Sequence, residues 1–155
     1  MQTAGEILER KGHEIISVSP DDTIYNALKV MLGKNIGAIL VKDGEDYVGI
    51  WTERDLMRDV MDENFNPRTA KVKDHMVTGL KFADHSESCY QLLDKFLGMR
   101  LRHLLIKKND KYIGILSIGD VNKALLVEKT KEIERLNQMV SWRYYEDWKW
   151  KKKTY

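Results

Sequence analysis

The chain has 155 residues, 43% apolar and 32% charged, which is ordinary for one compact soluble domain or two small ones. No apolar run approaches the roughly 20 residues of a membrane span, and the first residues lack a signal peptide's apolar stretch. A single cysteine, Cys89, excludes an internal disulfide, so we expect a cytoplasmic protein. The net charge of +2 is the sum of +3 in residues 141–155, with five Lys/Arg against two Asp/Glu, and −1 in the rest, so a polyanion-binding body is not indicated.

The first predicted elements follow the order β-α-β-β-α: a strand over 15–18, a helix over 24–34, strands over 36–41 and 47–51, and a helix from near Glu53. Leu28, Met31 and Leu32 have the spacing of an apolar helical face. Polar residues before that helix suit its amino-terminal cap, and Gly33 is expected to end it in a left-handed turn. The two later strands, joined by the polar turn KDGED, predict a hairpin.

The same pattern returns 65 residues later: a strand over 80–83, a helix over 89–99, strands over 101–106 and 112–117, and a helix from Ile118. Leu93, Phe96 and Leu97 repeat the apolar face, and Gly98 repeats the expected helix end. The pairs that are identical without a gap include Tyr25/Tyr90, Leu28/Leu93, Leu32/Leu97, Gly33/Gly98, Lys42/Lys107, Tyr47/Tyr112, Gly49/Gly114, Ile50/Ile115 and Asp55/Asp120. This ungapped register indicates an internal duplication.

Each half, at about 60 residues, is small for burying a core alone. We therefore predict an α/β (α+β) fold in which two β-α-β-β-α units pack about a pseudo-twofold axis. The expected organisation is a first unit with the N-terminal segment over 1–61, a polar linker over 62–74, a second unit over 75–126, and a C-terminal helix and tail over 127–155.

The stretch GIWTERD and its echo GILSIGD place a hydroxyl and a carboxylate three residues apart at a strand-to-helix corner. Thr52 or Ser117 could simply cap the following helix. Alternatively, Asp55 and Asp120 could each accept two hydroxyl hydrogens from a diol, as an acidic residue does with ribose in dinucleotide folds. The duplication favours diol recognition, because both copies carry both groups at the same corner.

These units, with the closing pattern G-h-x-[ST]-x-x-D, resemble CBS domains, and the tandem over about residues 7–126 resembles a CBS pair, or Bateman module. Leu105 stands where the family's R-H-x-P-V strand usually has proline. The resemblance implies a non-catalytic regulatory, energy-sensing module that binds an adenine nucleotide between the units: AMP foremost, with ADP, ATP, NAD and S-adenosylmethionine as alternatives. It also implies a homodimer and a protein target acted on in trans.

Carried over by the resemblance, Thr52 and Asp55 would hold one ribose, and Ser117 and Asp120 another. The contacts completing the first site would be Gly79, Leu80, Lys81, Leu101, Arg102 and His103. Those completing the second would be Glu14, Ile15, Ile16, Ile36, Gly37 and Ala38. Base-binding roles fall to Gly79, Leu80, Leu101, Ile15, Ile16, Gly37 and Ala38.

The two predicted sites differ in charge. Phosphate-binding groups gather at the first site: Arg102, His103, Lys81 and Arg54. The equivalent positions at the second are uncharged: Gly37, Ala38, Ile16 and Gly119. We therefore expect the Thr52/Asp55 site to bind the phosphorylated ligand more tightly.

Other candidates are weaker. His85, Cys89 and His75 are too few for the usual zinc site, so a helix-cap histidine and a buried cysteine are favoured. No nucleophile–base arrangement indicates catalysis. His103 could be a core residue or a phosphate ligand, and Trp51 could be a core residue or flank the adenine.

The C-terminal region predicts a long helix continuing the second unit, with apolar positions Leu125, Val127, Ile133, Leu136 and Val140. Beyond it, WRYYEDWKWKKK suggests packing on the body or on a dimer mate; a membrane surface or nucleic acid is disfavoured. The competing function is an interaction or scaffold protein that works through this tail and has a vestigial cleft.

Overall fold

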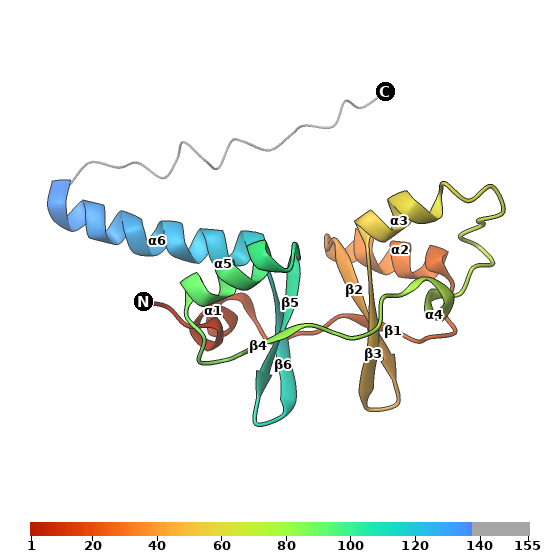
Figure 1. The fold of residues 1–155 in the computed structure, drawn as a ribbon, viewed down its shortest axis with the longest axis horizontal. Helices are drawn as coiled ribbons and strands as arrows, with labels where there is room; N and C mark the ends of the chain where they lie inside the picture. Colours follow the sequence, from red (N-terminus) through yellow and green to blue (C-terminus); the bar gives the residue numbers. More distant parts are fainter. Residues whose placement is uncertain (138–155) are drawn as a thin grey trace.

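Two three-stranded sheets stand side by side, each with its own helices, in the computed structural model, which describes residues 1–137 (Figure 1). The first half contains α1 (Ala4–Lys11), β1 (Ser17–Val18), α2 (Ile24–Lys34), β2 (Ala38–Asp43), β3 (Asp46–Thr52) and α3 (Glu53–Asp59). The second contains α4 (Val72–His75), β4 (Phe82–Asp84), α5 (Cys89–Gly98), β5 (His103–Lys108), β6 (Lys111–Ser117) and α6 (Ile118–Asn137). The Trp/Tyr/Lys-rich tail and Val140 lie outside the described residues.

The sheets have the same topology, which confirms the predicted fold class. In each, a short first strand pairs in parallel with the middle strand, and the middle strand pairs in antiparallel fashion with the last. Even the irregularity repeats: the register shifts between Val41 and Lys42 in one hairpin and between Ile106 and Lys107 in the other. These two breaks lie 65 residues apart, so the duplicated sequence specifies the same local geometry twice.

The predicted apolar helical faces contain both buried and exposed residues. Met31 and Phe96 are buried in the two cores, but Leu32 and Leu97 are 78% and 70% exposed. The 3/4 spacing identifies residues on one broad face and does not say where that face turns toward solvent. Because both copies expose the same leucine, the outward apolar position is itself a repeated feature.

The expected glycine turns at the helix ends are wrong. Gly33 and Gly98 lie inside α2 and α5, and the left-handed residues are Asn35 (φ 54°) and Arg100 (φ 52°). The Asn35 backbone N–H donates to the α2 carbonyls that would otherwise lack a partner. Asparagine is the residue that tolerates this conformation best after glycine, so the turn forms two residues later than expected.

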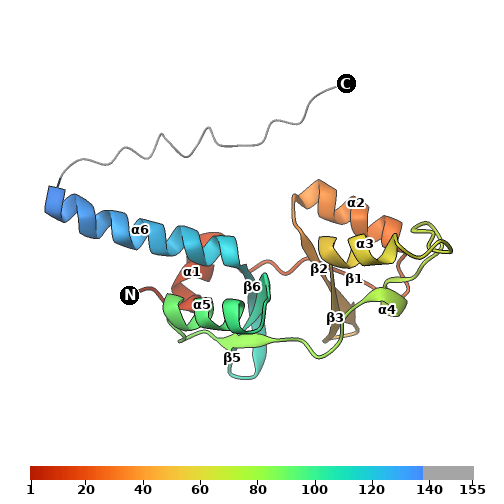
Figure 2. The same cartoon turned by 45° about the horizontal axis from the view of Figure 1, so that its top comes forward.

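The segment that precedes each unit along the chain packs on the other unit. Residues of the predicted linker pack on the first unit, where Val72 is fully buried. The N-terminal helix α1, which we grouped with the first unit, packs on the second, and Ala4, Ile7 and Leu8 belong to that core (Figure 2). Backbone hydrogen bonds hold α1 on the second unit: the N–H groups of Ala4 and Gly5 donate to the carbonyls of residues 87 and 85, both at 2.8 Å.

Two glycines of the repeated motif permit this exchange. A Cβ atom at Gly49 would lie 2.4 Å from Met76 Sδ, and one at Gly114 would lie 2.6 Å from Leu8 Cδ2. Each exchanged segment therefore rests directly on a glycine of the last strand in the unit that it covers. Within residues 1–137, no helix has both the length and the apolarity needed to cross a membrane.

Gly114→Ala should lower the free energy of unfolding by about 1–3 kcal/mol, because the new methyl group overpacks the fully buried Leu8. Gly33→Ala is the matched control: it lies in α2 with nothing within 4 Å, so it should raise stability by up to about 1 kcal/mol. Urea unfolding of both variants measures this. Equal effects in the two variants would contradict the close-approach role of Gly114.

Candidate functional site

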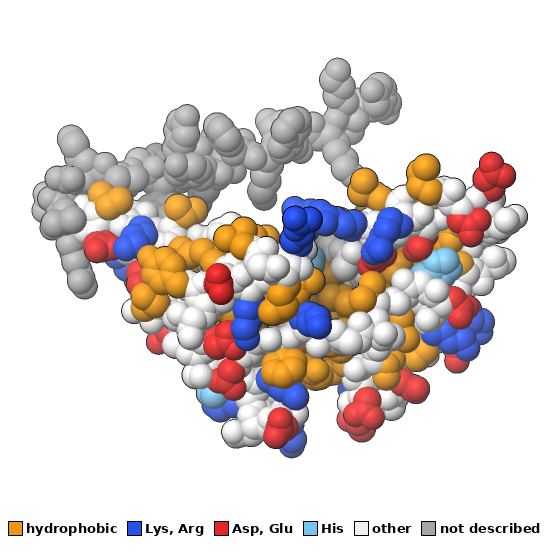
Figure 3. All heavy atoms as spheres, viewed as in Figure 1, with side chains coloured by type: hydrophobic (Ala, Val, Ile, Leu, Met, Phe, Trp, Pro, Cys, Tyr) orange, Lys and Arg blue, Asp and Glu red, His pale blue; other side chains and the backbone are white. Residues whose placement is uncertain are grey.

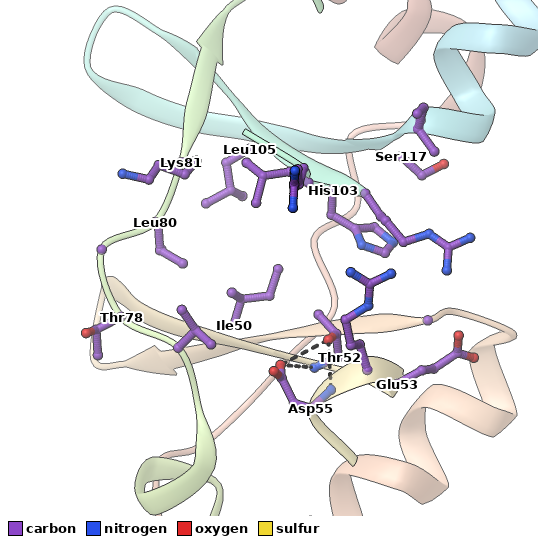
Figure 4. Close-up of a pocket in the computed structure, with 18 of the residues that line it drawn as sticks. Ile50, Thr52, Glu53, Asp55, Thr78, Leu80, Lys81, His103, Leu105 and Ser117 are labelled. Carbon is purple, nitrogen blue, oxygen red and sulfur yellow. Dashed lines mark hydrogen bonds between the residues drawn. The ribbon is translucent and has the colours of Figure 1, made fainter. Parts of the chain in front are cut away.

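A cavity of about 670 Å³ opens between the two units, a size typical of small-molecule sites (Figure 4). Most of its residues come from the β3–α3 corner, the stretch before β4 and the start of β5. The lining is Gly37, Ile50, Thr52, Glu53, Arg54, Asp55, Arg58, Val77, Thr78, Gly79, Leu80, Lys81, Arg100, Leu101, Arg102, His103, Leu105, Ser117, Ile118 and Gly119.

The Thr52/Asp55 corner forms one wall of this cavity. Asp55 Oδ2 accepts hydrogen bonds from the Thr52 backbone N–H at 2.9 Å and from the Thr52 hydroxyl at 3.0 Å. The Thr52 hydroxyl in turn accepts from the Asp55 N–H, which makes a capping box at the start of α3. Arg58, three residues on in the same helix, donates to the other oxygen of Asp55.

The Ser117/Asp120 corner has the same bonds at the start of α6. Asp120 Oδ2 accepts from the Ser117 N–H at 2.7 Å and from the Ser117 hydroxyl at 2.8 Å. Both hydroxyls thus have the capping role, which confirms the simpler of the two interpretations. A carboxylate has about four acceptor positions, so capping still leaves room for a diol at each corner, and diol recognition stays a prediction.

Cationic side chains concentrate at the larger cavity. The predicted Arg54, Arg102 and Lys81 all line it, and so do Arg58 and Arg100, which the sequence analysis missed. Lys and Arg side chains gather between the two halves in the space-filling view (Figure 3). Arg58 could have been found from its i, i+3 spacing to Asp55, which is an ion-pair spacing on a helix.

A second, smaller cavity of about 290 Å³ adjoins the Ser117/Asp120 corner. Its lining is Lys11, Glu14, Ile16, Asn35, Ile36, Gly37, Ala38, Leu40, His103, Ile115, Ser117 and Asp120. Gly37, His103 and Ser117 line both cavities. Among the described residues predicted as base contacts, Ile15 lines neither.

The smaller cavity has a cation that the sequence analysis did not predict. The uncharged residues Gly37, Ala38 and Ile16 line it as predicted, and Gly119 lines the larger cavity instead. The additional residue is Lys11 of α1, whose Nζ lies 2.7 Å from Asp120 Oδ2. Burial alone would raise the pKa of Asp120, but hydrogen bonds from Lys11 and Ser117 outweigh it and hold that pKa below its usual range. We missed Lys11 because we did not predict α1, although Thr3 and Glu6 form a capping box at its start.

His103 stands between the two cavities. Burial is the main cause of its lowered pKa, and the positive charges of Lys11 and Arg102 lower the pKa further. The imidazole is therefore neutral at pH 7, so one ring nitrogen donates a hydrogen bond and the other accepts one. A phosphate contact by His103 would use a neutral donor, with the positive charge supplied by the arginines.

Two other open questions are resolved by burial. Trp51 is fully buried, and its indole N–H donates to Asp59 Oδ2 at 3.0 Å, so it is a core residue. Cys89 is likewise fully buried in the second core, and burial raises the pKa of its thiol. Within the part of the chain that the structure describes, no cluster of three His, Cys, Asp or Glu residues could hold a metal ion.

The model of the CBS domain matches residues 4–62 and 72–127, so the chain belongs to the CBS-domain family. It is 32% identical over 151 residues to the mitochondrial CBS domain-containing protein CBSX3 of Arabidopsis thaliana, covering 92% of this chain and 73% of that one. Among solved structures, the CBS domain NE2398 is 36% identical with a TM-score of 0.77, covering 81% of this chain and 99% of that one. The CBS-domain containing protein ATU1752 from Agrobacterium tumefaciens is 33% identical with a TM-score of 0.76, covering 80% and 99%.

Two more distant structures share the fold and contain ligands. CBSX2 was solved in complex with AMP and is 22% identical with a TM-score of 0.66, covering 83% of this chain and 99% of that one. The CBS domain pair of MJ0100 was solved with 5-methylthioadenosine and S-adenosyl-L-methionine and is 16% identical with a TM-score of 0.71, covering 83% and 98%. All three of these ligands are adenosine compounds.

The lowered pKa of His103 predicts a pH effect on stability. The unfolded chain binds this proton at its ordinary pKa near 6.5, more readily than the folded chain does, so the free energy of unfolding should fall as pH drops below about 6.5. His103→Gln should reduce that fall, by about 1.4 kcal/mol for each unit by which the pKa is depressed.

Urea unfolding at pH 7.5 and 5.5 measures the difference. His13→Gln, at an exposed histidine outside both cavity linings, is the control and should keep the wild-type change with pH. If His103→Gln behaves like His13→Gln, the buried imidazole is not the source of the effect.

Proposed function

We propose that this chain is a non-catalytic regulatory module that binds an adenine nucleotide, AMP foremost, in the larger cavity. One observation carries the proposal: the cavity brings the Thr52/Asp55 pair of one unit against Arg102 and His103 of the other (Figure 4). Hydroxyl recognition and phosphate recognition thus meet across a single space of suitable volume.

In this proposal the ribose hydroxyls donate to Asp55, beside the Thr52 hydroxyl. The base lies on the apolar side of the cavity, against Gly79, Leu80 and Leu101. Gly79 has a left-handed backbone (φ 71°), which lets the chain turn at this point without a side chain in the way. Arg102, His103, Arg54 and Lys81 hold the phosphate, joined by Arg58 and Arg100.

The larger cavity is the better phosphate site. It has about twice the volume of the smaller cavity, and its lining contains five cationic side chains and two carboxylates. The smaller cavity, where Ile16, Gly37 and Ala38 would contact the base, has one lysine that is already paired with Asp120. We therefore keep the predicted preference and place the weaker site at Ser117/Asp120.

The ligands in the structures of CBSX2 and the MJ0100 domain pair support an adenosine ligand for this fold. The mechanism would be differential affinity. A ligand that touches both units stabilises the arrangement of the units that it fits best, and a partner reads that arrangement in trans. That target and the cytoplasmic location remain predictions, as does the scaffold role through the C-terminal tail, which lies outside the described residues.

Calorimetry and a thermal shift test the proposal with AMP, ATP, NAD and S-adenosylmethionine. Saturating AMP should raise the melting temperature, because it binds the folded state alone. Asp55→Asn should remove most of that rise, since the amide keeps the side-chain shape but loses one charged acceptor. Each variant is compared with its own ligand-free melting temperature, because Asp55 also caps α3.

Arg102→Gln separates phosphate recognition from nucleoside recognition. It should weaken AMP binding about tenfold, by loss of a charge-assisted hydrogen bond, and leave adenosine binding unchanged.

The control for Asp55→Asn is another carboxylate variant, Asp94→Asn. It lies on the exposed side of α5 and outside both cavity linings, and it should bind AMP like the wild type. An unchanged shift in Asp55→Asn refutes the ribose assignment.

We also propose that the module is a homodimer joined through the helices. Exposed apolar side chains recur on the helices of both units, with Leu32 and Met57 in the first and Leu97 and Leu126 in the second; Val60 and Met61 follow directly after α3. Leu32 and Leu97 are the equivalent residues of the repeat. A surface that repeats about a pseudo-twofold axis suits a second copy that carries the same repeat.

Sedimentation measures the dimer directly. The wild type should have twice the 18.2 kDa chain mass, and Leu32→Glu with Leu97→Glu should give a monomer with the same fold by circular dichroism. Phe82→Glu, at an exposed apolar residue of β4, is the control and should stay dimeric. A wild-type protein that sediments as a monomer at micromolar concentration contradicts the proposal.

A further inference from the structure

Each strand-to-helix corner pairs its carboxylate with a cation, but the two cations come from different parts of the chain. Arg58 belongs to the helix that Asp55 begins, whereas Lys11 comes from α1, more than 100 residues before its partner Asp120. We propose that Lys11 is a built-in occupant of the Ser117/Asp120 corner that keeps the smaller cavity from taking a ribose. The inference rests on the proposed function and predicts one bound nucleotide per chain.

Lys11 is held at this corner by packing that does not depend on the ion pair. The capping box of Thr3 and Glu6 starts α1, and backbone bonds fix the helix to residues 85–89 of the second unit. Leu8 is fully buried and rests on Gly114 of β6. The helix ends at Gly12, whose φ of 107° turns the chain away, so Lys11 is the last residue of a firmly placed helix.

The Lys11 ammonium binds the same carboxylate oxygen that the cap of α6 uses. Lys11 Nζ donates to Asp120 Oδ2 at 2.7 Å and to the Ile115 carbonyl at 2.9 Å. The Ser117 N–H and hydroxyl donate to the same carboxylate oxygen. A diol arriving at Asp120 must compete with a positively charged donor for the carboxylate, which is a stronger partner than a neutral hydroxyl.

The first corner offers less resistance. The Arg58 side chain is 69% exposed and pairs with Asp55 at i, i+3 on one helix, whereas the Asp55 side chain is only 6% exposed. Arg58 is therefore held from the solvent side, and ribose hydroxyls that enter the cavity can take its place as donors to the buried carboxylate. The segment that covers the first unit places Met76 on Gly49, as α1 places Leu8 on Gly114, and the lining of the larger cavity contains no residue of α1.

Size and charge at the smaller cavity agree with this role. Its volume of about 290 Å³ lies below the range usual for small-molecule sites. The Lys11 side chain, 38% exposed, lines this cavity together with Glu14, which pairs with Lys34 at 3.6 Å. The lining contains no arginine, and its one lysine is engaged with Asp120.

The test is the stoichiometry of AMP binding to the full chain by titration calorimetry. The wild type should bind one AMP. Lys11→Met keeps the length of the side chain and removes its donors, so this variant should bind a second AMP, at least tenfold more tightly than the wild type does at that corner. Lys95→Met removes an equally close ion pair, with Glu87 at 2.6 Å, outside both cavities and should still bind one AMP.

A measurement without ligand accompanies the titration. Carbon NMR of the aspartate carboxyl groups should show the pKa of Asp120 rising in Lys11→Met and unchanged in Lys95→Met, because only the first loses the Lys11 hydrogen bond. An unchanged Asp120 pKa overturns the inference.

The outcomes with AMP separate the two proposals. One AMP per chain in both the wild type and Lys11→Met overturns the inference and leaves the proposed function standing. Two AMP per chain in the wild type overturns the inference as well. No binding of AMP or ATP to any of the proteins refutes the proposed function and, with it, the role assigned to Lys11.

Discussion

The hydrogen bonds between a hydroxyl and a carboxylate at the strand-to-helix corner organise this molecule. At Thr52/Asp55 the same bonds end β3, start α3 and fix the direction of a buried carboxylate. Burying a carboxylate is costly unless donors surround it, and the backbone N–H, the hydroxyl and Arg58 supply them. The corner is therefore rigid, and a rigid acceptor at the edge of a cavity is suited to holding a polar ligand.

The two corners are built alike but have different surroundings. Each β-α-β-β-α unit repeats its strand pairing, its register shift and its cap, so the duplication alone would give two equal sites. The exchange of the preceding segments breaks that equality. The segment before the second unit brings Met76 to one sheet, and the N-terminal helix brings Lys11 to the other. The carboxylate of the smaller cavity is thereby paired with a lysine, whereas the arginines of the larger cavity belong to the units themselves, where the repeat has Arg54 against Gly119 and Arg102 against Gly37.

Much of this could be predicted from the sequence. The helices from Ile24 and Cys89, the hairpins and the closing helices follow from caps, apolar spacing and turn residues, which act over a few positions. The corner residues and most of the larger cavity's lining follow from the repeat together with the family resemblance. The glycine turns at Gly33 and Gly98 were wrong because local propensity favours glycine for the left-handed position, whereas each helix runs through its glycine and the left-handed residues are Asn35 and Arg100.

The two-unit architecture follows from the amino-acid sequence, since the repeat and the caps are local patterns that do not depend on distant contacts. The sequence also determines which corners carry a hydroxyl and a carboxylate. Three features follow from tertiary packing alone: which unit α1 covers, that Arg100 joins the larger cavity, and that Lys11 reaches Asp120. These depend on packing between segments up to 109 residues apart, where burial and backbone pairing select the partner and spacing along the chain gives no signal.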